Sequence, residues 1–111
     1  MELLFILLFY LGVSPIHGFV LVNKKLLAYQ RTDPIVESGI VSGHVHAVIG
    51  NNHFRQTFDP QVWSDATCTT MEIQENKSNY WVPSLYGIHD NGTYSAIPPM
   101  DIRVYYLNHV S

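Results

Sequence analysis

The chain has 111 residues, a formal net charge of −3 and only six lysines and arginines together. This length allows one domain at most, and the shortage of basic residues argues against nucleic-acid binding, because a basic face supplies most of the affinity for phosphates. Aromatic residues make up 13% of the chain and charged residues 14%, a balance that excludes a disordered chain and predicts a packed core.

Residues 1–18 have the pattern of a secretory signal peptide. Residues 3–13 are uniformly apolar, Ser14-Pro15 breaks the run, and the small residue Gly18 stands where cleavage is expected. The run is shorter than the roughly 20 residues that span a membrane, so no stable membrane anchor is predicted. Glu2 and the lack of an early Lys or Arg leave two alternatives, a buried strand or short core helix, and an uncleaved anchor. We expect residues 19–111 to form a secreted domain, extracellular or in the cell wall.

Downstream, short apolar runs separated by Gly and Pro predict a β-rich domain. Extended segments are expected at residues 19–22 and 26–29, and a longer strand at residues 40–49. Asp59-Pro60 is typical of a helix start, with Asp59 as the N-cap and Pro60 at the first helical position. A short helix is therefore predicted to run as far as residue 66.

The second half of the chain continues the β pattern. Residues 80–86 are predicted to be extended with a bend at Pro83, and Asn91-Gly92 is the strongest hairpin-turn signal. Residues 103–107 form a β-branched and aromatic strand that has little left to pair with. We therefore predict a mainly β domain, an antiparallel sheet or sandwich with one short helix, incomplete at its C-terminus.

Three further features concern the cellular setting. Asn76-Lys77-Ser78 and Asn91-Gly92-Thr93 both match the N-glycosylation sequon, which agrees with secretion. Cys68 is the single cysteine. In a secreted protein this indicates a missing partner, an intermolecular bond or a free thiol.

A pair of histidines is the first candidate for chemistry. On a strand, Ser42, His44 and His46 would share one face, and the two imidazoles would line one polar cleft. Three interpretations stay open: two half-buried, hydrogen-bonded histidines, a non-metal active or binding cleft, and a metal site. A metal site needs at least a third protein ligand, for which His53, His89 or Asp33 are available.

The second candidate is the segment of residues 77–83, with the sequence Lys-Ser-Asn-Tyr-Trp-Val-Pro. If extended, it turns Lys77, Asn79 and Trp81 to one face. Aromatic rings beside amide and amine donors suit a sugar-binding groove, since the ring covers C–H surface and the polar groups bond the hydroxyls. The alternative is that Tyr80 and Trp81 belong to the core.

Asp33 is the third candidate, because the proline that follows it restricts its backbone. It could form a turn, bind a metal or act as a rigid carboxylate in acid–base catalysis, and the first of these is favoured. Glycoside hydrolysis usually needs two carboxylates, and no spacing among the acidic residues identifies such a pair.

Several segments together resemble a known family. They are Arg-Thr-Asp-Pro-Ile-Val at residues 31–36, Gly-Ile-Val-Ser-Gly-His-Val-His at 39–46 with a glycine at 50, Cys-Thr-Thr at 68–70, Asn-Lys-Ser-Asn-Tyr-Trp-Val-Pro-Ser-Leu-Tyr at 76–86 and Val-Tyr-Tyr-Leu at 104–107. In this order and spacing they resemble DUF1996, a secreted fungal domain family of unknown function that often accompanies WSC carbohydrate-binding modules. The resemblance spans roughly residues 26–108 and corresponds to the N-terminal part of the domain.

The resemblance implies an extracellular or cell-wall setting and supplies no activity. The family signature falls here on Asp33, His44, His46, Lys77, Asn79, Tyr80 and Trp81. The chain departs from the pattern at Gly43, where the family has a serine, and at Met71, where the family has a second cysteine. This second departure implies that the cysteine pairing is broken.

The leading hypothesis is a carbohydrate-active domain that needs no cofactor. Asp33, His44 and His46 would be catalytic, with a histidine or Asp33 as general acid or base. Lys77 and Asn79 would hold sugar hydroxyls, and Tyr80 and Trp81 would complete the binding surface, Trp81 by stacking. The alternatives are a non-catalytic module that binds cell-wall polysaccharide, a metal-binding extracellular protein and an inactive fragment.

Overall fold

The computed structural model describes residues 17–108, and this part of the chain is mainly β. Every strand pair is antiparallel and one short helix is present among the described residues, which confirms the predicted fold class. The elements in chain order are β1 (His17–Asn23), β2 (Ala28–Gln30), β3 (His46–Gly50), α2 (Pro60–Ser64), β4 (Asn79–Pro83), β5 (Leu85–Ile88), β6 (Tyr94–Ile97) and β7 (Ile102–Asn108).

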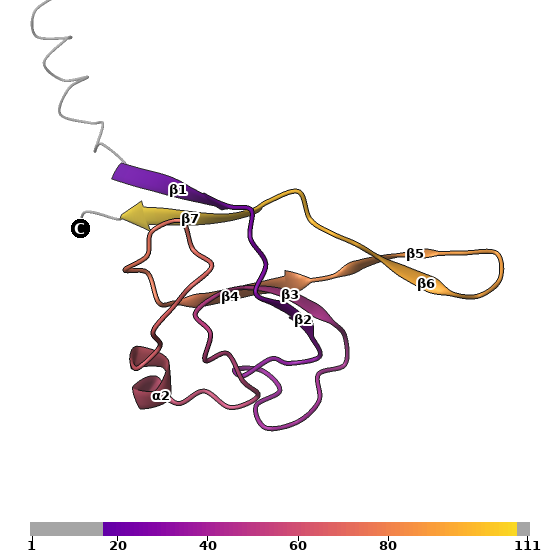
Figure 1. The fold of residues 1–111 in the computed structure, drawn as a ribbon, viewed down its shortest axis with the longest axis horizontal. Coiled ribbons are helices and arrows are strands. Elements are labelled where there is room, and N and C mark those ends of the chain that lie inside the picture. Colours follow the sequence, from indigo (N-terminus) through magenta and orange to yellow (C-terminus); the bar gives the residue numbers. More distant parts are fainter. Residues whose placement is uncertain (1–16, 109–111) are drawn as a thin grey trace, which may run out of the picture.

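Two layers enclose the hydrophobic core. Strands β1 and β7 form a two-stranded ribbon and β2-β3-β4 form a three-stranded sheet, with the ribbon on one side of the sheet (Figure 1). Ala47 and Ile49 of β3 pack in the core with Met71 and Ile102. Because successive residues of a strand point to opposite faces, the other residues of β3 turn away from the ribbon. That second face is covered by the loops and the α2 segment (Figure 1).

The last strand was expected to lack a partner, and this expectation is wrong. β7 pairs with β1 along its whole length, from His17 opposite Asn108 to Asn23 opposite Ile102. At its inner end the buried Asn23 amide donates to the Ile102 carbonyl at 3.4 Å. The predicted signal peptide lies mostly outside the described residues, and its expected cleavage position after Gly18 falls within β1.

The long strand predicted over residues 40–49 is also wrong in its first half. Only His46–Gly50 is a strand, because residues 40–45 bond to a neighbouring loop instead of to a β ladder. The Arg31 side chain donates to the Ser42 carbonyl at 2.8 Å, and the Ser42 N–H donates to the Arg31 carbonyl at 3.0 Å. The Glu37 carboxylate accepts from the Gly43 N–H at 3.0 Å. Side chains of the preceding loop thus decide its backbone path.

Two local sequence signals are confirmed. The Asp59 carboxylate accepts from the Gln61 N–H at 3.0 Å and caps α2. Asn91-Gly92 forms the turn of a β5-β6 hairpin, in which Gly92 adopts a φ of 79°. This hairpin projects away from the two layers (Figure 1).

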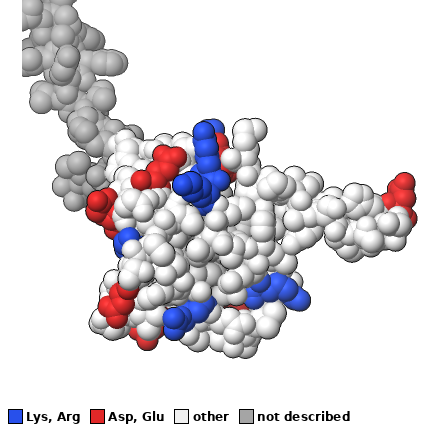
Figure 2. Space-filling model, viewed as in Figure 1, with Lys and Arg blue, Asp and Glu red and all other residues white. Residues whose placement is uncertain are grey.

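The molecular surface mixes charges of both signs. Figure 2 shows basic and acidic groups interspersed over the main body, separated by large uncharged areas, with an acidic group at the far end of the hairpin. Within residues 17–108, no helix is long and apolar enough to cross a membrane.

Candidate functional site

His46 and Trp81 lie on the same face of the three-stranded sheet. In the register of β3 and β4, His46 is opposite Pro83 and Val48 is opposite Trp81, and residues opposite each other in a pair share a face. This is the face turned away from the core. His46 is 3% exposed, and its Nδ1 lies 3.0 Å from the Thr32 carbonyl oxygen, so a backbone group orients the imidazole.

The two imidazoles of the His-x-His segment lie together, although only His46 is on a strand. His44 is in the preceding loop and exposed, and its ring centroid is 4.4 Å from that of His46 with the planes at 58°. The loop therefore brings about the juxtaposition that alternation on one strand was expected to produce. His44 is open to solvent and His46 forms the buried side of the pair.

Asp33 reaches the same place from the loop of residues 31–45. Its Oδ1 accepts from the N–H groups of Ile35 at 3.1 Å and Val36 at 2.9 Å, which forms a turn. The hydrogen bond from Val36 is the largest cause lowering the pKa of Asp33, and Ile35, the Trp81 side chain and the charge of His46 lower it further. Asp33 is therefore held as a carboxylate close enough to His46 for the two charges to interact.

Glu37 is a second carboxylate near the histidines that the sequence reasoning did not select. The Ser42 side chain and then the Gly43 N–H lower the pKa of Glu37, with a smaller contribution from the charge of His44. Two carboxylates thus flank the two imidazoles, and hydrogen bonds favour the ionised form of both. No signal in the sequence separates Glu37 from the other acidic residues.

This polar cluster, defined as Asp33, Glu37, His44 and His46, has a restricted chemistry. Hydrolysis of a glycosidic bond uses one protonated carboxyl as the acid, whereas both carboxyls here are held ionised. The turn formed by Asp33 favours the turn-forming role over the roles of metal ligand and acid–base carboxylate. Among residues 17–108, no three His, Cys, Asp or Glu side chains gather as a metal site.

The two other proposed metal ligands are engaged elsewhere. His53 Nδ1 lies 2.7 Å from the Val62 carbonyl oxygen, and His89 Nε2 lies 2.7 Å from Ser95 Oγ on the hairpin. What the polar cluster offers a ligand is therefore a set of hydrogen-bonding groups: two carboxylates and the exposed imidazole of His44.

An aromatic run extends from the polar cluster along the same face. The ring centroids are 5.4 Å apart between Trp81 and Phe54, 6.1 Å between Phe54 and Trp63, and 4.8 Å between Trp63 and Phe58. Three of the rings are half-buried, and Phe58 is 51% exposed. This aromatic run, defined as Trp81, Phe54, Trp63 and Phe58, forms a continuous apolar strip with accessible edges.

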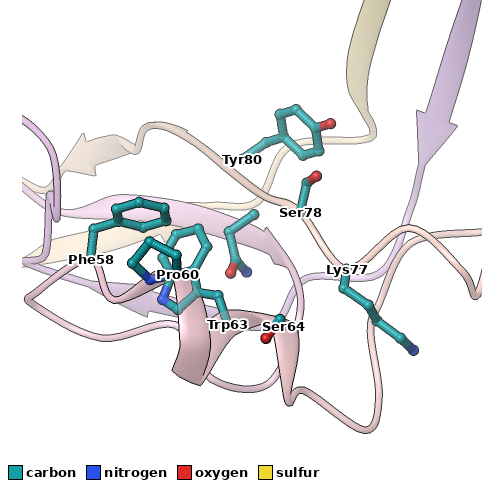
Figure 3. Close-up of a pocket in the computed structure, with 8 residues that line it drawn as sticks. Phe58, Pro60, Trp63, Ser64, Lys77, Ser78 and Tyr80 are labelled. Carbon is teal, nitrogen blue, oxygen red and sulfur yellow. The ribbon is translucent and has the colours of Figure 1, made fainter.

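A pocket lies at the far end of the aromatic run. Its volume is about 550 Å³, and its wall consists of two groups, Phe58, Pro60, Trp63 and Ser64 near α2, and residues 77–80 before and at the start of β4. Figure 3 shows Phe58, Pro60 and Trp63 gathered on one side, while Lys77 extends on the other. We call this hollow the α2 pocket. It is wide and open to solvent on most sides, so it suits part of an extended ligand better than an enclosed small molecule.

Asn79 occupies a buried position in the wall of the α2 pocket. Its Nδ2 donates to the Ile49 carbonyl at 3.2 Å and to the Asn51 carbonyl at 3.0 Å. This fixes the orientation of the amide, and its Oδ1 is left without a hydrogen-bond partner. Trp63 Nε1 is also buried without a partner. Two residues that line the pocket therefore have one unpaired acceptor and one unpaired donor, both buried beneath its surface.

The remaining predicted binding residues divide between the pocket and the core. Lys77 lies at the pocket and its Nζ is 3.5 Å from the Thr67 carbonyl. Tyr80 packs against the hydrophobic core, its hydroxyl bonds to that of Tyr106, and its ring turns away from Trp63 (Figure 3). The alternative that Tyr80 and Trp81 belong to the core is therefore correct for Tyr80 only. Trp81 lies on the opposite face of the sheet.

The structure therefore brings the predicted residues together in two places on one side of the sheet. Asp33, His44, His46 and Trp81 meet at one end, and Lys77 and Asn79 lie at the α2 pocket. Sequence reasoning did not select the three rings that connect them, those of Phe54, Phe58 and Trp63. For Trp63 a signal existed, since the Asp59-Pro60 cap places it on a short helix. For the two phenylalanines nothing local distinguishes them from core residues.

Comparison with known proteins gives one match. A family model described as a domain of unknown function, DUF1996, matches residues 33–111, more than half of the chain. The matched segment begins at Asp33 and contains the whole polar cluster, the aromatic run and the α2 pocket. No curated protein and no solved structure matches the chain.

Proposed function

Since the chain belongs to the DUF1996 family, whose description states no activity, we propose a function from the site itself: the protein binds polysaccharide along the aromatic run. The observation that carries this proposal is the placement of the run, between a polar cluster at one end and a mainly apolar pocket with Lys77 in its wall at the other. A linear glycan laid along it would meet rings in the middle and hydrogen-bonding groups at both ends.

The chemistry of a sugar chain suits this arrangement. A pyranose ring has apolar C–H faces that pack on aromatic rings and a rim of hydroxyl groups that need hydrogen-bond partners. Trp81 and Trp63 would provide the stacking surface. The carboxylates of Asp33 and Glu37 would accept from hydroxyls at one end, and Lys77 would donate at the other.

Binding without hydrolysis is the version that the polar cluster favours. A glycosidase with two carboxylates keeps one of them protonated to act on the leaving group. Here hydrogen bonds lower the pKa of both Asp33 and Glu37, which leaves neither suited to that task near neutral pH. The histidines would then act as hydrogen-bonding groups toward the glycan.

The proposed setting is extracellular. The apolar N-terminal residues and the two sequons support it. Expression of the full chain in a secreting eukaryotic host tests this part separately. We expect the protein in the medium with Phe19 as its first residue, and retention of the uncleaved chain inside the cells would contradict it.

Co-sedimentation with insoluble polysaccharides tests binding. The purified chain is mixed with chitin, cellulose, β-1,3-glucan and mannan, and the bound fraction is measured as a function of polysaccharide concentration. We expect saturable binding of the parent to at least one of them. Trp81→Ala removes an aromatic stacking contact of about 1–1.5 kcal/mol, so we expect it to lower the affinity about five- to tenfold.

The hairpin supplies a matched control. Tyr94 is 66% exposed on β6, far from the aromatic run, so Tyr94→Ala should bind as the parent does. Equal losses in both variants, or no retention of the parent on any of the four polysaccharides, would remove the proposal. Release of soluble sugar by the parent, lost in a His44→Ala, His46→Ala double variant, would show an enzyme in place of a binding module.

A further inference from the structure

Two side chains that line the α2 pocket, Asn79 and Trp63, each have a buried polar atom whose hydrogen bond is unmade. Asn79 is 7% exposed, its Nδ2 is fully used, and its Oδ1 has no donor. Trp63 Nε1 has no acceptor. A buried polar group without a partner costs about 1–3 kcal/mol, and native proteins contain few of them. Both side chains line one pocket, and solvent reaches neither atom in this structure, so a ligand that supplies the missing partners has to displace the side chains that cover them.

The pair is complementary to one chemical group. A secondary amide has one N–H, which Asn79 Oδ1 can accept, and one carbonyl oxygen, to which Trp63 Nε1 can donate. The pocket also contains the carbon surfaces of Phe58 and Pro60, against which a small methyl group can pack. An acetamido group combines all three features, whereas a sugar hydroxyl brings no methyl group.

Phe58 packs against the indole of Trp63. Its ring is half-exposed and packs edge-on against Trp63, with an interplanar angle of 86°, and Figure 3 places it beside Pro60 and Trp63 at one side of the pocket. It is the side chain that an entering ligand would displace. The phenyl ring has no polar atom, so only packing holds it in place.

We propose that the α2 pocket recognises the acetamido group of an N-acetylhexosamine unit. This inference rests on the proposed binding of a glycan and specifies which one: a polymer with N-acetylated sugars, bound with one acetamido group between Asn79 Oδ1 and Trp63 Nε1. Neighbouring sugar units would then lie along the aromatic run toward Trp81.

Matched oligosaccharides distinguish this inference from the broader proposal. Isothermal titration calorimetry of the full chain is carried out with three β-1,4-linked trisaccharides: N-acetylglucosamine, glucose and glucosamine trimers. They share one backbone and differ only at carbon 2. We expect the acetylated trimer to bind at least about tenfold more tightly than either of the others, as two buried hydrogen bonds to the amide imply.

A conservative pair of variants tests the pocket. Trp63→Phe keeps an aromatic ring and removes the Nε1 donor, so we expect the ratio of affinities for the acetylated and glucose trimers to fall about five- to tenfold, whatever the change in stacking common to both trimers. Trp81→Phe lies outside the pocket and should weaken both trimers by the same factor. Thermal melts of both variants establish that they are folded.

Each outcome has a separate meaning. Equal affinity for the acetylated and glucose trimers would overturn the acetamido inference and leave glycan binding intact. Tighter binding of the glucosamine trimer would overturn it as well, since attraction of an ammonium group to carboxylates would then explain the affinity. An unchanged preference in Trp63→Phe would move recognition away from this pocket. Failure of the parent to bind any of the trimers or the insoluble polysaccharides would remove both proposals.

Discussion

The three-stranded sheet and the β5-β6 hairpin are built from similar amino acids but differ in what surrounds them. Every residue of β3 is buried, with the core on one side and the loops that carry the site on the other. On the hairpin, Leu85, Ile88 and Tyr94 are each more than half exposed. The hairpin strands pair only with each other, whereas β3 pairs with strands on both sides.

This difference indicates where substitutions will have consequences. In the sheet, successive residues face the core and the site in turn while the same strands pair with each other, so a change on one face affects the other through the shared backbone. In the hairpin the side chains act almost independently. Apolar character alone therefore does not identify the structural centre of this chain, and matched substitutions in the two regions should give unequal effects.

The largest effect is expected for glycine substitutions. Gly50 ends β3 with a φ of 115°, and a Cβ there would lie 2.1 Å from the Ser78 carbonyl oxygen. Gly50→Ala combines backbone strain with overpacking, so we expect a loss of about 2–6 kcal/mol in unfolding free energy. Gly92 in the hairpin turn also has a positive φ, but a Cβ there meets nothing within 4 Å. Gly92→Ala should cost only about 1 kcal/mol, and equal costs in urea titrations would refute the contrast.

Isoleucine truncations give the next largest contrast. Ile49 is 0% exposed in the core and Ile88 is 72% exposed on the hairpin. Ile49→Ala leaves a cavity and should cost about 2–5 kcal/mol, while Ile88→Ala should stay within about 0.5 kcal/mol of the parent. Chemical denaturation measures both. A cost above about 2 kcal/mol for Ile88→Ala would contradict the exposed position of the hairpin and show that its apolar side chains are packed in solution.

The helix cap links stability to the site. Asp59→Ala removes the acceptor for the first turn of α2, which should cost about 1 kcal/mol. It should also weaken glycan binding, because α2 holds Trp63 in the aromatic run. Asp90→Ala makes the same substitution at the hairpin turn and should change neither the unfolding free energy nor the glycan affinity. An uncapped variant with unaltered affinity would show that α2 does not position the indole.

The smallest effect is expected at Asp33. The folded-state pKa of its carboxyl lies below the ordinary value of 3.8, so the ionised form contributes stability above about pH 4, and this contribution is lost as the pH falls through the lowered value. Asp33→Asn keeps an acceptor for the turn and removes the charge. We expect it to lower the unfolding free energy by less than about 1 kcal/mol at pH 7, with the difference disappearing in acid. If the difference in unfolding free energy between the parent and Asp33→Asn grew as the pH fell, the lowered pKa of Asp33 would be contradicted.

The elements that the sequence predicts well are those with a local cause. Asp59-Pro60 and Asn91-Gly92 specify a helix start and a turn through their own side chains and backbone. The pairing of β1 with β7 depends on a partner far along the chain. The path of residues 40–45 depends on side chains only 11 and 6 residues before the backbone groups that they bond, but outside the apolar pattern from which a strand was predicted. Arg31 and Glu37 divert that loop through bonds to Ser42 and Gly43.

The same distinction applies to the site. Period-two alternation correctly separates Tyr80 from Trp81, and the sharing of one face by His46 and Trp81 required the β3-β4 register. The contribution of Phe54 and Phe58 could not be predicted, because an aromatic residue in a loop has no sequence mark that distinguishes a binding surface from a core.

Intrinsic tryptophan fluorescence tests the central claim most directly. Trp63 and Trp81 are the two tryptophans of the chain, and both belong to the aromatic run. Titration with a glycan that the protein retains should shift the emission to shorter wavelength and saturate at the midpoint measured by calorimetry, since sugar rings would replace water on both indoles. Calorimetric binding with unchanged emission would place the glycan elsewhere on the molecule and contradict the account.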